Sequence, residues 1–235
     1  MNTVGTQNES NRIKWLEKTL KKIPRDSKIL DAGAGEQQFK KFCSHLNYVS
    51  QDFAQYDGTG DSRGLQVGKW EQTLLDIVSD IISIPEPDES FDVILCTEVF
   101  EHLPEPILAI KEFSRLLRPD GCLILSAPFC SLTHFSPYHF YTGFNRYFYE
   151  THLPAHGFKV IELESNGNFF EYLAQEIRRI SYIAELYTKN NPTILEKLAL
   201  KIVLRMLQKF SKHDKGSEEL LHFGCHILAV KIKLL

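Results

Sequence analysis

A short apolar segment that ends in an acid and two glycines constrains this chain more than any other feature. It runs Lys28-Ile-Leu-Asp31-Ala-Gly33-Ala-Gly35. Glycines directly after a strand allow a tight turn and let main-chain amides approach a ligand closely. Asp52 follows near the end of the next expected strand, where an acid can accept hydrogen bonds from ribose hydroxyls. The pattern predicts an α/β fold that binds a small, nucleotide-like cofactor.

Strand-like and helical segments alternate along the chain, which favours a mostly parallel sheet with right-handed crossovers. Five strands are expected at 28–32, 47–51, 76–79, 91–96 and 122–127. Two later alternating segments, 158–164 and 226–232, would close the sheet. Helices are expected at 11–23 and 107–117, and again at 169–186 and 193–210, between the last two strands. We therefore expect one domain over residues 1–235 that contains a helical insertion at 168–213.

Composition excludes several classes of protein. The net charge of −3 argues against nucleic acid as a general partner, and 43% hydrophobic residues are ordinary for a globular chain. Residues 1–10 are polar, and no run of about 18 apolar residues occurs, so neither a signal peptide nor a membrane span is expected. The five cysteines are scattered and odd in number, which predicts reduced thiols and a cytoplasmic location.

The charge of the turn after the first expected strand is informative about the ligand. A carboxylate at Asp31 would repel phosphates but attract an ammonium or sulfonium group. A dinucleotide fingerprint would have a third glycine at position 38, where this chain has Gln38. Asp80 and Ile81 end the third strand and offer a carboxylate and an apolar wall to a base. The alternative is that each acid only caps a turn or helix.

Taken together, these motifs resemble those of class I S-adenosylmethionine-dependent methyltransferases with a small Rossmann-like domain. The resemblance covers residues 28 to 165 and is specific only in combination. It depends on four segments, which are Ile29–Gly35, Asp80–Pro85, Ser90–Pro104 and Leu116–Leu125. It implies a Rossmann-like sheet of seven mostly parallel strands with one antiparallel edge strand and helices on both faces.

The resemblance also implies which residues hold S-adenosylmethionine. It assigns Asp31, Gly33 and Gly35 to the methionine part, Asp52 to the ribose, Asp80 and Ile81 to adenine, and Thr97 and Glu98 to the sulfonium end. The chain departs from the family at Gln37, where a glycine is usual. The acids and the first two glycines remain.

The region after the fifth strand, residues 128–149, is dense in aromatic residues and contains His134 and His139. It follows the carboxyl end of a strand beside the expected methyl group, so it is interpreted as the acceptor pocket or its lid. His139 is the first candidate for the general base and His134 the second. The further candidates for substrate contacts are Tyr138, Tyr141, Arg146 and His102. Alternatively, the aromatic residues are core, the histidines satisfy main-chain groups, and Arg146 forms a surface ion pair.

Glu98 and His102 would be neighbours on a helix at a spacing of i and i+4, and we interpret them as pocket-shaping residues. A metal site formed by Glu98, His102, His134 and His139 is conceivable, but no local spacing requires it. The sequence alone therefore gives no expectation of a metal.

The function expected from the sequence is methyl transfer to a small molecule, with an oxygen of a sugar, sugar phosphate or related metabolite of polysaccharide biosynthesis as the acceptor. A non-catalytic module that binds S-adenosylmethionine or a nucleotide is the alternative, and a nicotinamide oxidoreductase fits less well. Residues 195–212 form a basic amphipathic segment that can contact an anionic membrane, another protein or its own sheet. A homodimer is also conceivable.

Overall fold

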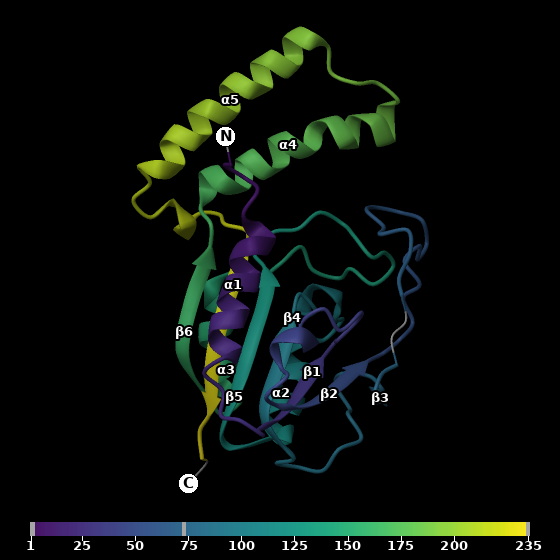
Figure 1. Ribbon diagram of the computed structural model, residues 1–235, viewed down its shortest axis with the longest axis vertical. Helices are drawn as coiled ribbons and strands as arrows, with labels where there is room; N and C mark the ends of the chain where they lie inside the picture. The colour runs from purple at the N-terminus through teal and green to yellow at the C-terminus, as the bar shows by residue number, and fades with distance from the viewer. Residues whose placement is uncertain (1–2, 72–73, 234–235) are drawn as a thin grey trace. The chain divides into compact units, whose positions relative to one another are not determined.

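The computed structural model describes residues 3–71 and 74–233. Figure 1 shows a sheet with helices around it and a pair of long helices formed by later residues. The strands are β1 (Lys28–Ala32), β2 (Asn47–Asp52), β3 (Ile77–Val78), β4 (Phe91–Thr97), β5 (Leu117–Pro128), β6 (Phe158–Asn166) and β7 (Gly224–Lys231). The helices are α1 (Asn8–Leu20), α2 (Pro106–Leu116), α3 (Arg146–Ala155), α4 (Phe169–Thr188) and α5 (Ile194–Lys212). Short 3₁₀ helices are η1 (Lys40–Phe42), η2 (Phe100–His102) and η3 (Ser217–Glu219).

The strands form one sheet in the order β3-β2-β1-β4-β5-β7-β6. The pairs β1–β2, β1–β4, β2–β3 and β4–β5 are parallel, and β7 is antiparallel to β5. The amide of Ile232 donates to the carbonyl of Gly157, and the amide of Phe223 donates to the carbonyl of Asn166. The start of β6 therefore lies beside the end of β7, and the end of β6 lies beside the start of β7. The predicted Rossmann-like, mostly parallel sheet is confirmed. The antiparallel strand β7 lies one place in from the edge, and β6 is outermost.

The two faces of the sheet are covered by different helices. Alternate residues of the central strands, such as Leu30, Ile94 and Leu125, are fully buried in one cluster with Ile110 and Phe113 of α2. The residues between them along each strand point to the other face of the sheet, where His226 of β7 stacks on Trp15 of α1. Helices therefore cover both faces, as predicted.

The segment between β1 and β2 differs from the expectation. A helix is usual there in doubly wound folds, but the described residues form turns followed only by the 3₁₀ helix η1. Gly33, Gly35 and Gln37 all have positive φ angles, of 76°, 50° and 55°, which no α-helix accommodates. Gln37 thus adopts, as a non-glycine residue, the backbone conformation that glycine adopts without strain.

The chain divides into two compact units, one formed by residues 15–164 and 224–235 and the other by residues 1–14 and 165–223. The first unit contains every predicted site residue. The predicted insertion at 168–213 falls within the second unit, which is larger than expected because it also includes the N-terminal segment. In that unit Val4 is fully buried with Ala174, Leu204 and Leu207.

The helices α4 and α5 form an antiparallel pair in the second unit (Figure 1). A capping box begins α5, in which Thr193 and Glu196 bond each other's main-chain amides. Among the described residues, no helix is long and apolar enough to cross a membrane.

Candidate active site

The turn after β1 is held by the neighbouring strand. The amide of Gly33 donates to the carbonyl of Gln51 at 2.9 Å, and the amide of Gly35 donates to Oδ2 of Asp52 at 3.0 Å. A Cβ atom on Gly33 would lie 2.5 Å from Cγ2 of Val99, closer than any real contact. The structure therefore requires glycine at position 33 and brings Gly33, Gly35 and Asp52 together, as predicted.

Asp31 is buried at the end of β1, with 2% of its surface exposed. Its Oδ2 atom accepts a hydrogen bond from the hydroxyl of Tyr48, a residue of β2. Burial raises the pKa of Asp31 to about 7, the Tyr48 hydrogen bond lowers it, and the nearby charge of Asp52 raises it. This carboxyl group therefore lies in a desolvated environment that favours a neighbouring positive charge.

The other predicted cofactor acids have partners within their own loops. Asp52 accepts from the amide of Ala54 at 2.9 Å as well as from Gly35. Asp80 is exposed and accepts from the amide of Ile82, which is the turn-capping role considered as the alternative. Ile81 is 5% exposed and packs in the main hydrophobic cluster of the sheet.

The register between β4 and β5 determines where Thr97 and Glu98 lie. Thr97 pairs with Ser126, and its hydroxyl oxygen is buried with no hydrogen-bond partner among the described residues. Glu98 has a φ of 55° and accepts a hydrogen bond of 2.8 Å from the Ser126 hydroxyl. Both residues lie at the carboxyl ends of the central strands, where ligands bind in open α/β sheets.

Two loops at this edge, residues 53–71 and 129–145, are joined by main-chain hydrogen bonds. Leu65 donates to Thr133 at 2.9 Å and accepts from Phe135 at 3.1 Å, so the two residues that flank His134 are fixed. Gly64 lies so close that a Cβ atom there would be 2.6 Å from the Thr133 carbonyl oxygen. These contacts hold His134 in position.

Aromatic rings connect the glycine turn to the histidine-containing loop. Trp70 lies against Gly35, where a Cβ atom would be 2.8 Å from its ring. Phe135 contacts Trp70 edge-on and stacks on Tyr56, with ring centroids 4.5 Å apart. The opposite neighbour of Phe135 is His102, which stacks on it with centroids 5.2 Å apart. The sequence analysis did not identify Trp70 or Tyr56, although a tryptophan at the end of a glycine-rich loop was an available signal.

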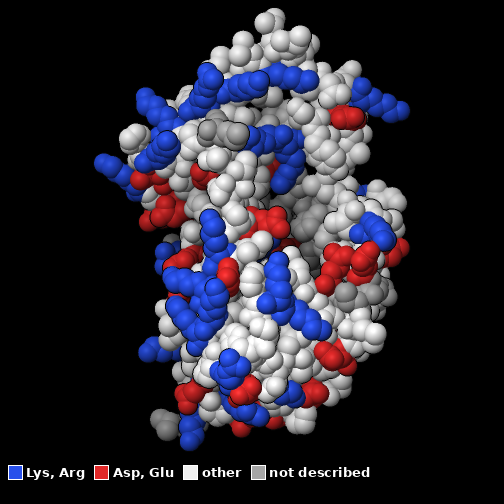
Figure 2. All heavy atoms as spheres, in the orientation of Figure 1, with Lys and Arg blue, Asp and Glu red and all other residues white. Residues whose placement is uncertain are grey.

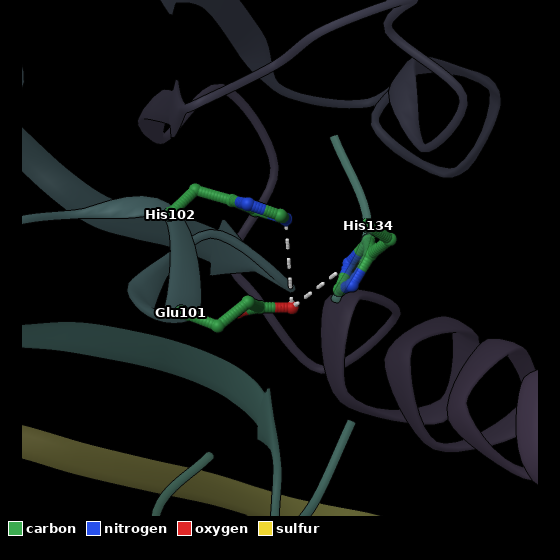
Figure 3. Close-up of side chains that lie close together, drawn as sticks. All are labelled: Glu101, His102 and His134. Atoms are coloured by element: carbon green, nitrogen blue, oxygen red, sulfur yellow. Dashed lines mark ion pairs between the residues drawn. The ribbon is translucent and has the colours of Figure 1, made fainter. Parts of the chain in front are cut away.

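Three histidines gather beside these rings. The ring centroids of His102 and His134 are 4.7 Å apart, and those of His134 and His139 are 4.9 Å apart. Glu101 lies among them, with its Oε1 atom 3.8 Å from Nε2 of His102 and 3.9 Å from Nε2 of His134. Figure 3 shows both imidazoles directed at this carboxylate. The structure therefore brings these histidines from two separate segments into one cluster.

The expected pairing of Glu98 with His102 is wrong. Residues 100–102 form the 3₁₀ helix η2, and Glu98 precedes it in a left-handed conformation, so i and i+4 are not neighbours on a helix here. Glu98 bonds Ser126 instead, and Glu101 takes the place beside His102. Glu101 was not a candidate because its role depends on the local backbone and not on spacing.

Hydrogen bonds orient the three imidazoles. Nδ1 of His102 donates to the carbonyl of Tyr138, so Nε2 of this ring carries no proton when the ring is neutral, and Nδ1 of His134 donates to the carbonyl of Leu132 at 2.8 Å. The hydroxyl of Ser131 donates to Thr142, so it accepts from Nε2 of His139 at 3.1 Å. The free base atom of His139 is then Nδ1.

Burial affects the pKa values of these histidines. Burial first, and then the neighbouring His134, lower the pKa of His102 to about 3, and the same two causes lower the pKa of His139. The two imidazoles are therefore neutral near pH 7, which a base requires.

The predicted substrate residues differ in their surroundings. Tyr138 packs edge-on against Phe53 and accepts a hydrogen bond from His102, so it lies in the cluster. Tyr141 donates to the Pro104 carbonyl and is 39% exposed. Arg146 begins α3 and forms an exposed ion pair of 2.7 Å with Glu150. This is the surface role that was the alternative for Arg146.

A hollow of about 530 Å³ lies at the first turns of α2 and α3. Its lining is mostly apolar and includes Pro104, Ile107, Phe144 and Phe148. Tyr141 is the one predicted substrate residue in the lining, and none of the three histidines belongs to it. The hollow is therefore separate from the histidine cluster.

A model of the methyltransferase domain family matches residues 6–185, which is most of the chain. The chain belongs to this family. Among curated methyltransferases, it is 25% identical over 118 residues to the ubiquinone biosynthesis O-methyltransferase of Leptothrix cholodnii. That match covers 49% of each chain, so this chain spans about half the length of the curated relative it matches.

Solved structures show how widely this methyltransferase fold is used. A S-adenosylmethionine-dependent methyltransferase from Archaeoglobus fulgidus superposes with a TM-score of 0.57 at 15% identity, covering 95% of this chain and 94% of that one. The [4+2]-cyclase SpnF superposes equally well, with a TM-score of 0.58 at 14% identity, covering 99% and 85%. These likenesses show the fold, and the second shows that the fold alone does not determine the reaction.

S-adenosylmethionine is the cofactor of this methyltransferase family, and the residues at the sheet edge fit its charge and shape. Gly33 and Gly35 form a turn in which side chains are excluded, and Asp31 and Asp52 supply negative charge beside it. The buried hydroxyl of Thr97 has no partner among the described residues, so it is available to a ligand. The contacts of each residue with the cofactor remain predictions.

Proposed function

We propose that this methyltransferase transfers a methyl group from S-adenosylmethionine to a hydroxyl oxygen of a small molecule. The observation that supports an oxygen acceptor is the cluster of His102, His134 and His139 at the carboxyl edge of the sheet. A neutral hydroxyl must lose its proton as it is methylated, and imidazole is suited to take it. The O-methyltransferase named among the relatives agrees with this choice.

When bound, S-adenosylmethionine supplies a methyl group on a sulfonium whose sulfur retains the bonding electron pair when the methyl group leaves. Asp31 and Asp52 place carboxyl groups beside the glycine turn, and a cationic donor favours the charged form of Asp31, whose pKa is raised to about 7 by burial. Trp70, Tyr56 and Phe135 form an apolar wall over the turn and exclude water from it. Alignment and water exclusion are the main contributions of a protein to this displacement.

His139 takes the acceptor proton on Nδ1 in this proposal. Its Nε2 proton is donated to Ser131, which is itself oriented by the Thr142 carbonyl. This arrangement fixes the tautomer of His139 and leaves its lone pair available. His134 remains the second candidate for the base.

The acceptor we propose is a ring-bearing metabolite with a hydroxyl group. Phe53, Tyr138 and Phe135 offer ring faces and edges that pack against either a sugar or a phenol. The narrower prediction, a sugar or sugar phosphate of polysaccharide biosynthesis, is retained for testing. A sugar phosphate acceptor has less support than a sugar, because Arg146, the residue expected to pair with a phosphate, is paired with Glu150.

The experiment is to measure S-adenosylhomocysteine formation with the purified protein and a panel of catechols, sugars and sugar phosphates. We expect turnover with at least one hydroxyl compound and a fall in kcat of about 10²–10⁴-fold in His139→Ala. His156→Ala is the matched control, because His156 bonds a main-chain carbonyl outside the cluster. Binding of S-adenosylmethionine without turnover on any acceptor favours the non-catalytic binding module instead.

We further propose that α5 contacts an anionic lipid surface. Leu195, Leu198, Ile202 and Met206 of the predicted apolar stripe are exposed, while Leu207 of that stripe and Leu204 beside it are buried. Lys197, Lys201, Arg205 and Lys209 are exposed as well, and Figure 2 shows basic side chains along this helix. Sedimentation with anionic but not neutral vesicles is the expected result, and equal recovery with both contradicts it. The cytoplasmic location and the homodimer stay predictions.

A further inference from the structure

The side chains of Glu101, His102 and His134 place three electron-rich atoms together. All three donor atoms lie within 4.8 Å of one another. Both imidazoles give their Nδ1 proton to a main-chain carbonyl and direct Nε2 at the Glu101 carboxylate (Figure 3). This arrangement places two ring nitrogens and a carboxylate oxygen in one small volume.

This volume is largely removed from solvent. The side chain of Glu101 is 1% exposed, that of His102 14% and that of His134 24%. A buried carboxylate is costly unless positive charge compensates it. A cation held between the three side chains supplies such charge.

We propose that Glu101, His102 and His134 bind one divalent first-row transition-metal ion, such as Zn²⁺, Mn²⁺ or Fe²⁺. Two imidazoles and one carboxylate suit these ions better than Mg²⁺ or Ca²⁺, which favour all-oxygen sites. Three protein ligands leave coordination positions for a further ligand. No metal was expected from the sequence, because no local spacing required one, and the conceivable ligand set contained Glu98 and not Glu101.

The ligands are oriented before any ion binds. His102 is fixed by the Tyr138 carbonyl and by stacking on Phe135, and His134 by the Leu132 carbonyl. Metal-binding histidines usually donate their second ring nitrogen to such a partner, which directs the free lone pair at the metal. Donor atoms around one ion lie about 3–3.5 Å apart. The separations of 3.8 and 3.9 Å from Glu101 therefore contract when the ion binds.

The ion acts on the acceptor, a step that depends on the proposed function. An acceptor hydroxyl at an open coordination position has a lowered pKa and loses its proton more readily. His139 is next to His134, with ring centroids 4.9 Å apart, and takes that proton. The site would then select acceptors whose hydroxyl can reach the ion.

The test is to titrate chelator-treated protein with metal ions. Binding of Co²⁺ is monitored by the visible absorption of the bound ion, and binding of Zn²⁺ and Mn²⁺ is measured by calorimetry. We expect one site per chain. Glu101→Gln, His102→Ala and His134→Ala each weaken binding at least tenfold. His156→Ala keeps full affinity. Absence of binding by the wild-type protein, or equal binding by all variants, overturns the proposal.

Two further measurements separate the possible failures. Thermal unfolding without metal shows whether each variant folds. If Glu101→Gln does not fold, the same titration is made with His134→Gln, a change at the more exposed ligand, and its loss of metal affinity decides whether the site exists. Methyl transfer by the chelator-treated protein at the rate of the metal-loaded protein overturns the role in acceptor binding. Because metal binding is detected without turnover, failure to find a methyl acceptor counts against the proposed function and not against the metal site.

Discussion

The hydroxyl of Tyr48 lies 2.5 Å from Oδ2 of Asp31 and donates a hydrogen bond to it. This bond joins β2 to β1 two residues before Gly33, and the Asp31 side chain is buried. Despite the bond, burial raises the pKa of Asp31 to about 7. The acid that precedes the glycines therefore exchanges its proton near neutral pH, where its charge affects both folding and ligand binding.

The raised pKa of Asp31 predicts a stability that falls as pH rises. The folded protein retains this proton up to about pH 7, whereas the unfolded chain releases it near the ordinary value of 3.8. The folded state binds more protons between these values, so the free energy of unfolding decreases with increasing pH. Relative to Asp31→Asn, the wild-type protein should lose roughly 2–3 kcal/mol between pH 5 and pH 8.

Urea unfolding at both pH values measures this difference. Other titrating groups are common to the two proteins and cancel in the comparison. A constant difference in stability at pH 5 and pH 8 contradicts the raised pKa.

Gly33→Ala tests the close approach of the turn to Val99, which lies two residues after the end of β4. The new methyl group would lie 2.5 Å from Val99 at a φ of 76°, so we expect a loss of about 2–4 kcal/mol in unfolding free energy. In the double variant with Val99→Ala, the loss should be smaller than the sum of the two single losses. Strict additivity in this cycle would mean that the overlap with Val99 is not the cause.

Trp70 should report on ligand binding, because its ring lies against Gly35. We expect S-adenosylmethionine to change the tryptophan emission of the wild-type protein and of Trp15→Phe, but not that of Trp70→Phe. The chain has only these two tryptophans, so the assignment is unambiguous. A signal that persists in Trp70→Phe shows that the ligand binds elsewhere.

Arg146→Ala tests whether this residue contacts the acceptor. Its ion pair with Glu150 is exposed, and such pairs contribute less than about 1 kcal/mol. We expect a small change in stability and a KM for the acceptor within about twofold of the wild-type value. A rise in KM of tenfold or more would restore the substrate role predicted from the sequence.

The sheet could be predicted from the sequence because its strands are short apolar runs at regular spacing. The bounds expected for β1, β2 and β6 agree with the structure to within two residues, as do those of α4 and α5. The bounds expected for α1 and β5, 11–23 and 122–127, miss by more, because α1 is Asn8–Leu20 and β5 is Leu117–Pro128. Two local exceptions depend on single backbone conformations. Gln37 and Glu98 both adopt positive φ, and no propensity of glutamine or glutamate indicates it.

The site was predictable where the fold alone determines it. Gly33, Gly35 and Asp52 meet because the ends of parallel strands meet. The histidines meet because their loops follow neighbouring strands. The role of Glu101 was not predictable, since it depends on η2 being a 3₁₀ helix and not an α-helix. Trp70 reaches Gly35 from a loop whose path depends on hydrogen bonds between main-chain groups far apart in sequence.

Calorimetry of the wild-type protein with S-adenosylmethionine, S-adenosylhomocysteine and NAD tests the central claim most directly. The account predicts one site per chain for the two sulfur compounds, no measurable binding of NAD, and loss of binding in Gly33→Ala. Tight binding of NAD alone, or no heat with S-adenosylmethionine, would contradict it.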